Sequence, residues 1–102
     1  MPIIEHVAGE SLDLSEGKHA IMFHLPGHCA GCKMALNSLQ SKELKDITVE
    51  LIDAGDDENH SLVEQYGAST APTIIVFENG NEIGRMAGVK EYMAKNKEYF
   101  GI

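Results

Sequence analysis

Apolar residues in the first third of the chain fall into short runs that are typical of strands. Residues 19–25, of sequence HAIMFHL, form a compact apolar run that is closed by Pro26 and Gly27, and this run predicts a buried strand. Residues 3–7 predict a short edge strand ahead of it. Residues 9–18 between them are mostly polar, and their pattern indicates neither a helix nor a strand.

From Ala30 to about Leu44 the apolar spacing changes to that of a helix. Cys32, Leu36 and Leu39 are separated by four and then three positions, which places them on one helix face. Cys32 therefore belongs to the buried side of this predicted helix. Cys29 falls at its exposed start.

The rest of the chain continues the alternation of strands and helices. It predicts a strand at residues 47–53, a helix that begins at the acidic residues 56–58 and stops at Gly67, strands at 73–77 and 82–87 joined by an Asn79-Gly80 turn, and a final amphipathic helix at 89–100. Met86 and Met93 are expected to be core residues. Alternating elements of this kind predict an α/β fold.

Composition restricts the number of domains, the classes of partner and the compartment that fit this chain. The 102 residues, 43% of them hydrophobic, suffice for one domain, which we place at residues 1–102. The formal net charge of −8, with only 8 lysines and arginines, argues against binding to nucleic acid or to an anionic membrane surface. The N-terminal residues lack the pattern of a secretory leader, and no apolar run approaches the ~20 residues of a membrane span. We therefore expect a cytoplasmic protein.

Cys29 and Cys32 are the residues that most clearly indicate a chemical function. A disulfide across so short a loop constrains the unfolded chain little, so a purely structural role is disfavoured. A redox dithiol is the favoured interpretation, and a metal half-site or inert thiols are the alternatives. A zinc site that adds His24 and His28 lacks a second well-spaced ligand pair, so we predict no metal and no bound cofactor.

The predicted position of Cys29 suits nucleophilic chemistry. The thiolate is the nucleophile, and the unpaired amides and the dipole at a helix N-terminus stabilise it. The small residues Ala30 and Gly31 leave its sulfur open to a protein disulfide. We expect Cys29 to attack first and form a mixed disulfide, which Cys32 then resolves.

The order of elements, the Cys-x-x-Cys pair and a distant proline together resemble the thioredoxin family over most of the chain. The residues that carry the resemblance are Cys29, Cys32, Tyr66-Gly67, Thr70-Ala71-Pro72-Thr73, Asn79-Gly80 and Gly88. The resemblance implies a thioredoxin-like fold, with a central mixed β-sheet flanked by helices, and a cis Pro72 against the two sulfurs. We expect Thr70, Ala71, Pro72 and Gly88 to form a substrate groove, in which the Ala71 backbone pairs with an extended substrate strand.

The chain departs from that family at three places. His28 replaces a tryptophan before the first cysteine, and Ala30-Gly31 replaces a pair that contains proline. Phe23 occupies the position of a buried acid that takes the proton of the second cysteine; its neighbour His24 is expected to point to the opposite face of the strand. The acceptor of the Cys32 proton is therefore unassigned, with His24, Asp53 and a water as candidates. His28, His24 and Asp53 are also candidate modulators of the cysteine pKa values.

These observations predict a thiol-disulfide oxidoreductase that reduces protein disulfides, acts as a monomer and is recharged by a disulfide reductase. One alternative is a glutaredoxin-like, glutathione-dependent enzyme, since residues 25–27 (LPG) ahead of the cysteine are similar to that branch. The aromatic residue that this branch usually carries between its cysteines is missing here. A second alternative is a non-catalytic binding or metal-holding module that keeps the same fold.

Overall fold

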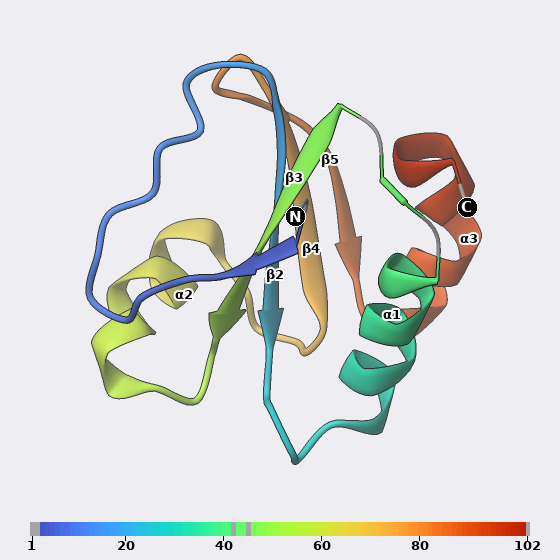
Figure 1. Cartoon of the computed structure of the whole chain (residues 1–102). Helices are drawn as coiled ribbons and strands as arrows, with labels where there is room; N and C mark the ends of the chain where they lie inside the picture. Colours follow the sequence, from blue (N-terminus) through green and yellow to red (C-terminus); the bar gives the residue numbers. More distant parts are fainter. Residues whose placement is uncertain (1–2, 42, 45, 102) are drawn as a thin grey trace.

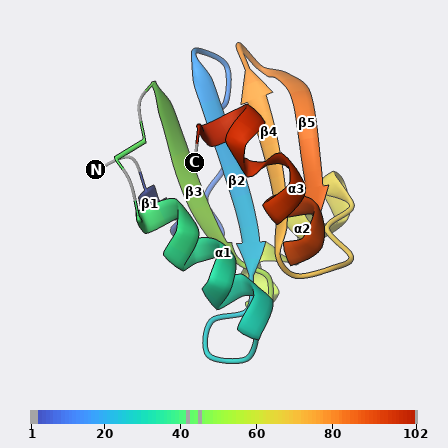
Figure 2. The same cartoon turned by 90° about the vertical axis from the view of Figure 1, so that its right-hand side faces the viewer.

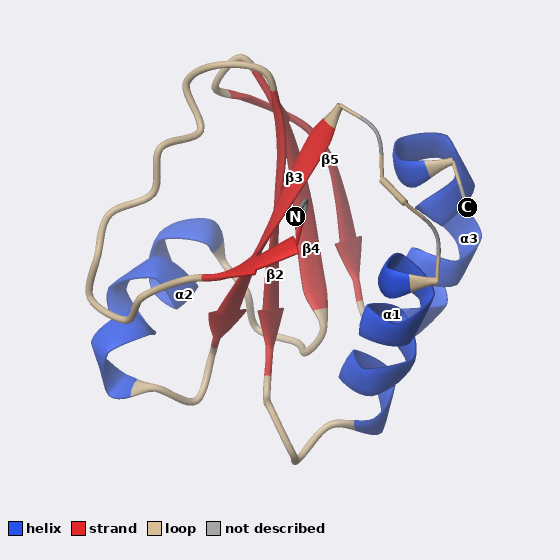
Figure 3. Ribbon diagram, viewed as in Figure 1, coloured by secondary structure: helices blue, strands red, loops and turns tan. Residues whose placement is uncertain are grey.

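Strands and helices follow one another in the order that the sequence predicts (Figures 1 and 3). The computed structural model describes residues 3–41, 43–44 and 46–101. Its elements are β1 (Ile3–Glu5), β2 (Lys18–His24), α1 (Ala30–Gln40), β3 (Ile47–Asp53), the short 3₁₀ helix η1 (Asp57–Asn59), α2 (His60–Tyr66), β4 (Thr73–Glu78), β5 (Asn81–Ala87) and α3 (Val89–Phe100). None of the helices in these residues is long and apolar enough to cross a membrane.

The strands form one mixed sheet in the order β1-β3-β2-β4-β5. β1, β3 and β2 run parallel, whereas β4 is antiparallel to both β2 and β5. In this register Met22 of β2 lies between Leu51 of β3 and Ile74 of β4. Asn79 and Gly80 both have positive φ, at 49° and 86°, and make the predicted hairpin turn between β4 and β5.

Helices cover both faces of this sheet (Figures 1 and 2). α1 and α3 lie on one face, and α2 lies on the other together with the loop between β1 and β2. Successive strand residues face opposite cores because side chains alternate along a strand. Ala20 and Met22 pack with the buried residues of α1 and α3, whereas Ile21 and Phe23 pack toward Tyr66 of α2.

The segment at residues 9–18 that the pattern left unassigned is mainly a loop, from which Leu12 and Leu14 pack on the α2-side core. Polar contacts hold the whole connection between β1 and β2 to the sheet and to η1. The buried His6 ring contacts the Glu50 carboxylate of β3 through Nδ1, and the Gly9 N–H donates to Asn59 Oδ1 at 3.4 Å.

Three details of the predicted elements are wrong. β1 ends at Glu5, two residues short of the strand predicted at residues 3–7. α1 ends at Gln40 instead of near Leu44, because the N–H and hydroxyl of Ser41 both donate to the carbonyl of Ser38 and close the last turn. Leu44 lies beyond the helix yet is buried in the core, so its apolar position fits a helix pattern although it belongs to a loop. Residue 42 of the predicted helix lies outside the described residues. Met93 is 50% exposed, since the adjacent Tyr92 takes the inward position on α3, whereas Met86 is fully buried as expected.

The ring of Tyr99 in α3 packs directly against Gly84 of β5. A Cβ added at Gly84 would overlap the phenol of Tyr99, whose hydroxyl donates to the Ile83 carbonyl at 3.4 Å. We expect Gly84→Ala to displace the ring and lower the free energy of unfolding by about 1–2 kcal/mol, measured by urea denaturation.

The matched control is the same substitution in a Tyr99→Ala background. Without the ring there is nothing to displace, so Gly84→Ala should be neutral or slightly stabilising there, as alanine suits a strand better than glycine. An equal loss in both backgrounds would show that the contact with Tyr99 is not the cause.

Candidate active site

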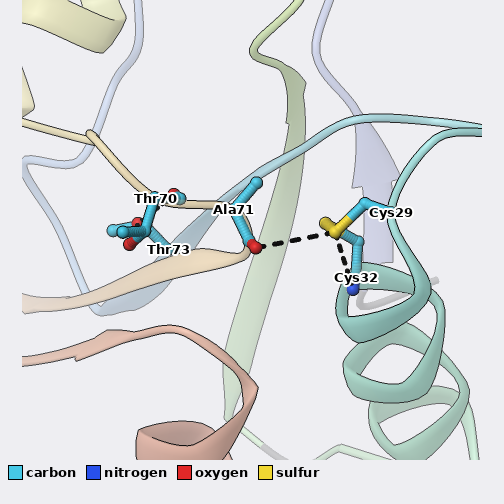
Figure 4. Close-up of a disulfide and its surroundings, with 5 residues drawn as sticks. All are labelled: Cys29, Cys32, Thr70, Ala71 and Thr73. Atoms are coloured by element: carbon cyan, nitrogen blue, oxygen red, sulfur yellow. Dashed lines mark hydrogen bonds between the residues drawn. A yellow bond between two sulfur atoms is a disulfide. The ribbon is translucent and has the colours of Figure 1, made fainter.

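The two cysteines sit at the start of α1 and form a disulfide (Figure 4). Cys29 is the N-cap residue of the helix, with extended backbone (φ −144°, ψ 105°), and its sulfur accepts a hydrogen bond from the N–H of Cys32 at 3.1 Å. A serine or aspartate oxygen usually satisfies that amide. Here a sulfur does so, and the positive end of the helix therefore points at Cys29.

The cysteines differ in exposure, much as the helical spacing predicts. Cys32 is 3% exposed and belongs to the core between the sheet and α1. Cys29 is half-buried instead of fully exposed, because the loop before β4 lies against it. The sulfur that is more open is thus the one at the helix end.

The loop before β4 brings the carbonyl oxygen of Ala71 to 3.5 Å from the Cys29 sulfur (Figure 4). A disulfide sulfur carries no proton, so this is a close contact in the oxidised state; the reduced Cys29 thiol has an acceptor there. The Ala71–Pro72 peptide bond is cis, as the resemblance implies. Within the described residues, neither the N–H nor the C=O of Ala71 has a backbone partner.

Backbone and side-chain bonds hold this loop in place. The hydroxyl of Thr73 donates to the carbonyl of Thr70, and the two threonine hydroxyls lie 3.1 Å apart. The N–H of Gly88 donates to the Pro72 carbonyl at 2.7 Å, which joins the loop to the start of α3. The structure therefore brings Thr70, Ala71, Pro72 and Gly88 together beside the disulfide.

Gly31 permits the close approach of α1 to that loop. A Cβ at this position would lie 3.3 Å from the Cβ of Val89 and 3.4 Å from the Cδ of Pro72, which is tighter than ordinary contact. The sequence suggests only that a small residue leaves the Cys29 sulfur open. The structure shows a second reason for glycine, since a larger residue would push α1 away from Pro72.

A cavity of about 780 Å³ lies on another side of the disulfide. Its lining consists of Glu5 from β1, Leu51 from β3, His24 and the following loop residues 25–28, both cysteines, and Ala30, Lys33 and Leu36 from α1. Thr70, Ala71, Pro72 and Gly88 are not part of this lining. The disulfide is therefore bordered both by the Pro72 loop and by the cavity.

His24 lies where the sequence reasoning did not expect it. Alternation does separate it from Phe23, but Phe23 is the residue that faces α2, and His24 lines the cavity with Cys32. The expected face was wrong because an acid at position 23 was assumed to point at the cysteines. Burial lowers the pKa of His24 from its usual value, and the charges of Asp53 and then Glu5 partly oppose that shift.

The other two candidate modulators take different positions. Asp53 pairs with His24 in the sheet register, and its carboxylate accepts from the N–H of Gly55 at 2.9 Å. It does not line the cavity. His28 is exposed in the turn before Cys29, at the rim of the cavity. Among the residues described, no three His, Cys, Asp or Glu side chains converge as a metal site.

Sequence reasoning missed Glu5, Lys33 and Leu51 as neighbours of the cysteines. Glu5 and Leu51 come together because β1 and β3 pair in parallel, with these residues opposite each other. No local pattern in the sequence points to that pairing. Lys33 follows Cys32 directly, and its place on the predicted helix was the available signal.

A mixed sheet with helices on both faces, a disulfide that caps α1 and a cis-proline loop beside it define the thioredoxin-like fold, with the arrangement found in thiol-disulfide oxidoreductases. The family model described as Thioredoxin matches residues 10–97. The chain belongs to the thioredoxin family.

Individual relatives agree with this assignment, and a solved structure shares the fold. The chain is 36% identical over 63 residues to a thioredoxin of Chlamydia caviae, a match that spans 62% of each chain. It is 28% identical over 91 residues to a thioredoxin of Echinococcus granulosus, covering 87% of this chain and 85% of that protein. Thioredoxin f from spinach chloroplast shares the fold with a TM-score of 0.76 at 15% identity, over 94% of this chain and 90% of that one.

Proposed function

We propose that this protein is a thiol-disulfide oxidoreductase that reduces protein disulfides through Cys29 and Cys32. The observation that carries the proposal is the hydrogen bond from the Cys32 N–H to the Cys29 sulfur at the N-terminus of α1. In the reduced protein the same amide and the helix dipole stabilise a thiolate at Cys29, which raises the fraction of the reactive form at neutral pH.

The reaction balances in two exchanges. The Cys29 thiolate attacks one sulfur of the substrate disulfide, a Cys29–substrate bond forms, and the other substrate sulfur leaves as a thiolate that takes up a proton. Cys32, as a thiolate, then attacks the Cys29 sulfur and displaces the second substrate thiolate. Two electrons and two protons pass from the dithiol to the substrate, and the Cys29–Cys32 disulfide remains.

The groove of Thr70, Ala71, Pro72 and Gly88 is proposed to hold the substrate. Ala71 has unpaired backbone groups beside the Cys29 sulfur, so an extended substrate segment can pair with it as an added strand. Pro72 is buried beneath Ala71 and contacts the start of α1 near Gly31. The groove thus places a substrate sulfur next to the nucleophile.

The protein is proposed to act as a small redox carrier. Residues 1–102 form one domain that acts as a cytoplasmic monomer, without a bound cofactor, and transfers electrons from a disulfide reductase to protein disulfides. The chain contains only two cysteines, adjacent in the fold, which suits a reducing compartment. Its net charge of −8 suits partners other than nucleic acid.

Insulin reduction with dithiothreitol as the electron source tests the function through the two cysteines separately. We expect activity in the wild type and a fall to the rate of dithiothreitol alone in Cys29→Ser, because the nucleophile is lost. Cys32→Ser should trap a mixed disulfide, visible as an added mass on the protein. Equal inactivity of all three, with stoichiometric zinc in the purified protein, would instead favour the metal-holding module.

His28 is proposed to tune the nucleophile through its charge. Its exposed position next to Cys29 allows a protonated imidazole to favour the thiolate, although solvent screens the effect. We expect His28→Ala to raise the pKa of the Cys29 thiol, measured from the pH dependence of alkylation. The control is His60→Ala, which replaces an exposed histidine of α2 and should leave the titration of Cys29 unchanged. If His28→Ala also leaves that titration unchanged, His28 does not tune the nucleophile.

A further inference from the structure

The proposed reaction leaves one proton without an acceptor. Cys32 must lose its thiol proton before it attacks the mixed disulfide, yet its side chain is 3% exposed and cannot release the proton directly into bulk water. The family position for a buried acid is occupied by Phe23, which packs against the α2 side of the sheet. Another group must therefore take this proton.

The cavity is the space beside Cys32 that an acceptor can use. At about 780 Å³ it exceeds by many times the ~30 Å³ that one water occupies. Besides the cysteines, the titratable groups along its lining are Glu5, His24, His28 and Lys33. They come from β1, β2, the loop before α1 and α1 itself, so every element that packs around the cavity apart from β3 contributes one.

These four groups differ in how readily they can accept the proton of Cys32. Glu5 is exposed, so its carboxylate lacks the burial that makes a carboxyl group a better match for a thiol proton, and a lysine ammonium such as that of Lys33 is a donor without an acceptor site. His28 is exposed in the turn at the rim. His24 is half-buried at the end of β2, within the cavity, and a neutral imidazole accepts a proton readily near pH 7.

We infer that His24 is the proton acceptor for Cys32 during resolution of the mixed disulfide, directly or through one water in the cavity. The inference rests on the proposed oxidoreductase function. The Cys32 proton moves to the free ring nitrogen of His24, the Cys32 thiolate attacks the Cys29 sulfur, and the substrate thiolate that leaves takes up a proton from solvent. The protonated His24 then returns its proton to water, so the histidine ends the cycle unchanged.

Nearby charges support this role. Asp53 of β3 lies beside His24 in the register, and Glu5 of β1 lines the same cavity. Both carboxylates favour the imidazolium that forms when the proton arrives. Lys33 and the rim residue His28 act in the other direction when protonated. Burial lowers the pKa of the His24 imidazole from its usual value, which favours the neutral form that can accept a proton.

Stopped-flow reaction of the reduced protein with a chromogenic aryl disulfide separates the two exchanges. The first equivalent of coloured thiolate marks attack by Cys29, and the second marks resolution by Cys32. We expect His24→Gln and His24→Ala to leave the first phase unchanged and to slow the second by roughly 10- to 100-fold at pH 7. Added imidazole should restore the second phase in His24→Ala, where the enlarged cavity admits it.

The pH profile distinguishes a proton acceptor from a merely structural residue. In the wild type the second phase should be flat through neutrality and fall at acidic pH, where His24 becomes protonated, because burial lowers the pKa of His24. In the variants it should instead rise about tenfold per pH unit through neutrality, because only the ionised thiol then reacts. His60→Gln, on the exposed surface of α2, is the matched control and should follow the wild type with and without imidazole.

The inference is overturned if both His24 variants resolve within twofold of the wild type, or if imidazole fails to accelerate His24→Ala. A wild-type second phase that rises steadily through neutrality overturns it as well, and that measurement needs no variant to fold. Failure of the proposed function is a different result: the wild type releases no first equivalent, or Cys29→Ser releases it as fast as the wild type.

Discussion

The chemistry of the site depends on the start of α1 being held at the end of β2. There the N–H of Cys32 points at the Cys29 sulfur at 3.1 Å, and the helix dipole adds to the same field. Contacts from elsewhere keep the helix in this position. The buried Tyr92 of α3 donates to Ser38 Oγ at 2.8 Å, and Gly31 lets Pro72 and Val89 approach closely. Dipoles that are fixed before the reaction need no reorganisation when the thiolate forms.

The sheet order also separates the two kinds of residue around the disulfide. β2 is the central strand, and α1 begins just beyond it. Pro72 precedes β4 and Gly88 follows β5, so the groove lies on one side of β2. Glu5 ends β1 and Leu51 belongs to β3, so the cavity lies on the other side. A protein substrate on the groove side therefore leaves the cavity side free for the movement of a proton.

Much of the fold follows from local patterns, and the errors follow from contacts that are distant in sequence. The apolar run of β2, the Asn79-Gly80 turn and the spacing of Cys32 and Leu39 each carry their own signal, and the structure confirms the elements they predict. Leu44 misled the end of α1 because a loop residue can be as buried as a helical one. The cavity carries no local signal, since parallel pairing of β1 with β3 brings Glu5 and Leu51 to the cysteines.

A histidine as proton acceptor makes different demands on its surroundings from those of a buried acid. Burial raises the pKa of a carboxyl group and so makes it a better match for a thiol, whereas it lowers that of an imidazole and makes it a poorer one. A buried histidine therefore needs nearby negative charge to accept a thiol proton. Asp53 and Glu5 provide that charge at the ends of the two strands beyond β2. In this chain the proton acceptor and its counter-charges come from three parallel strands whose ends meet at one edge of the sheet, so His24 and the two carboxylates are best understood as one unit.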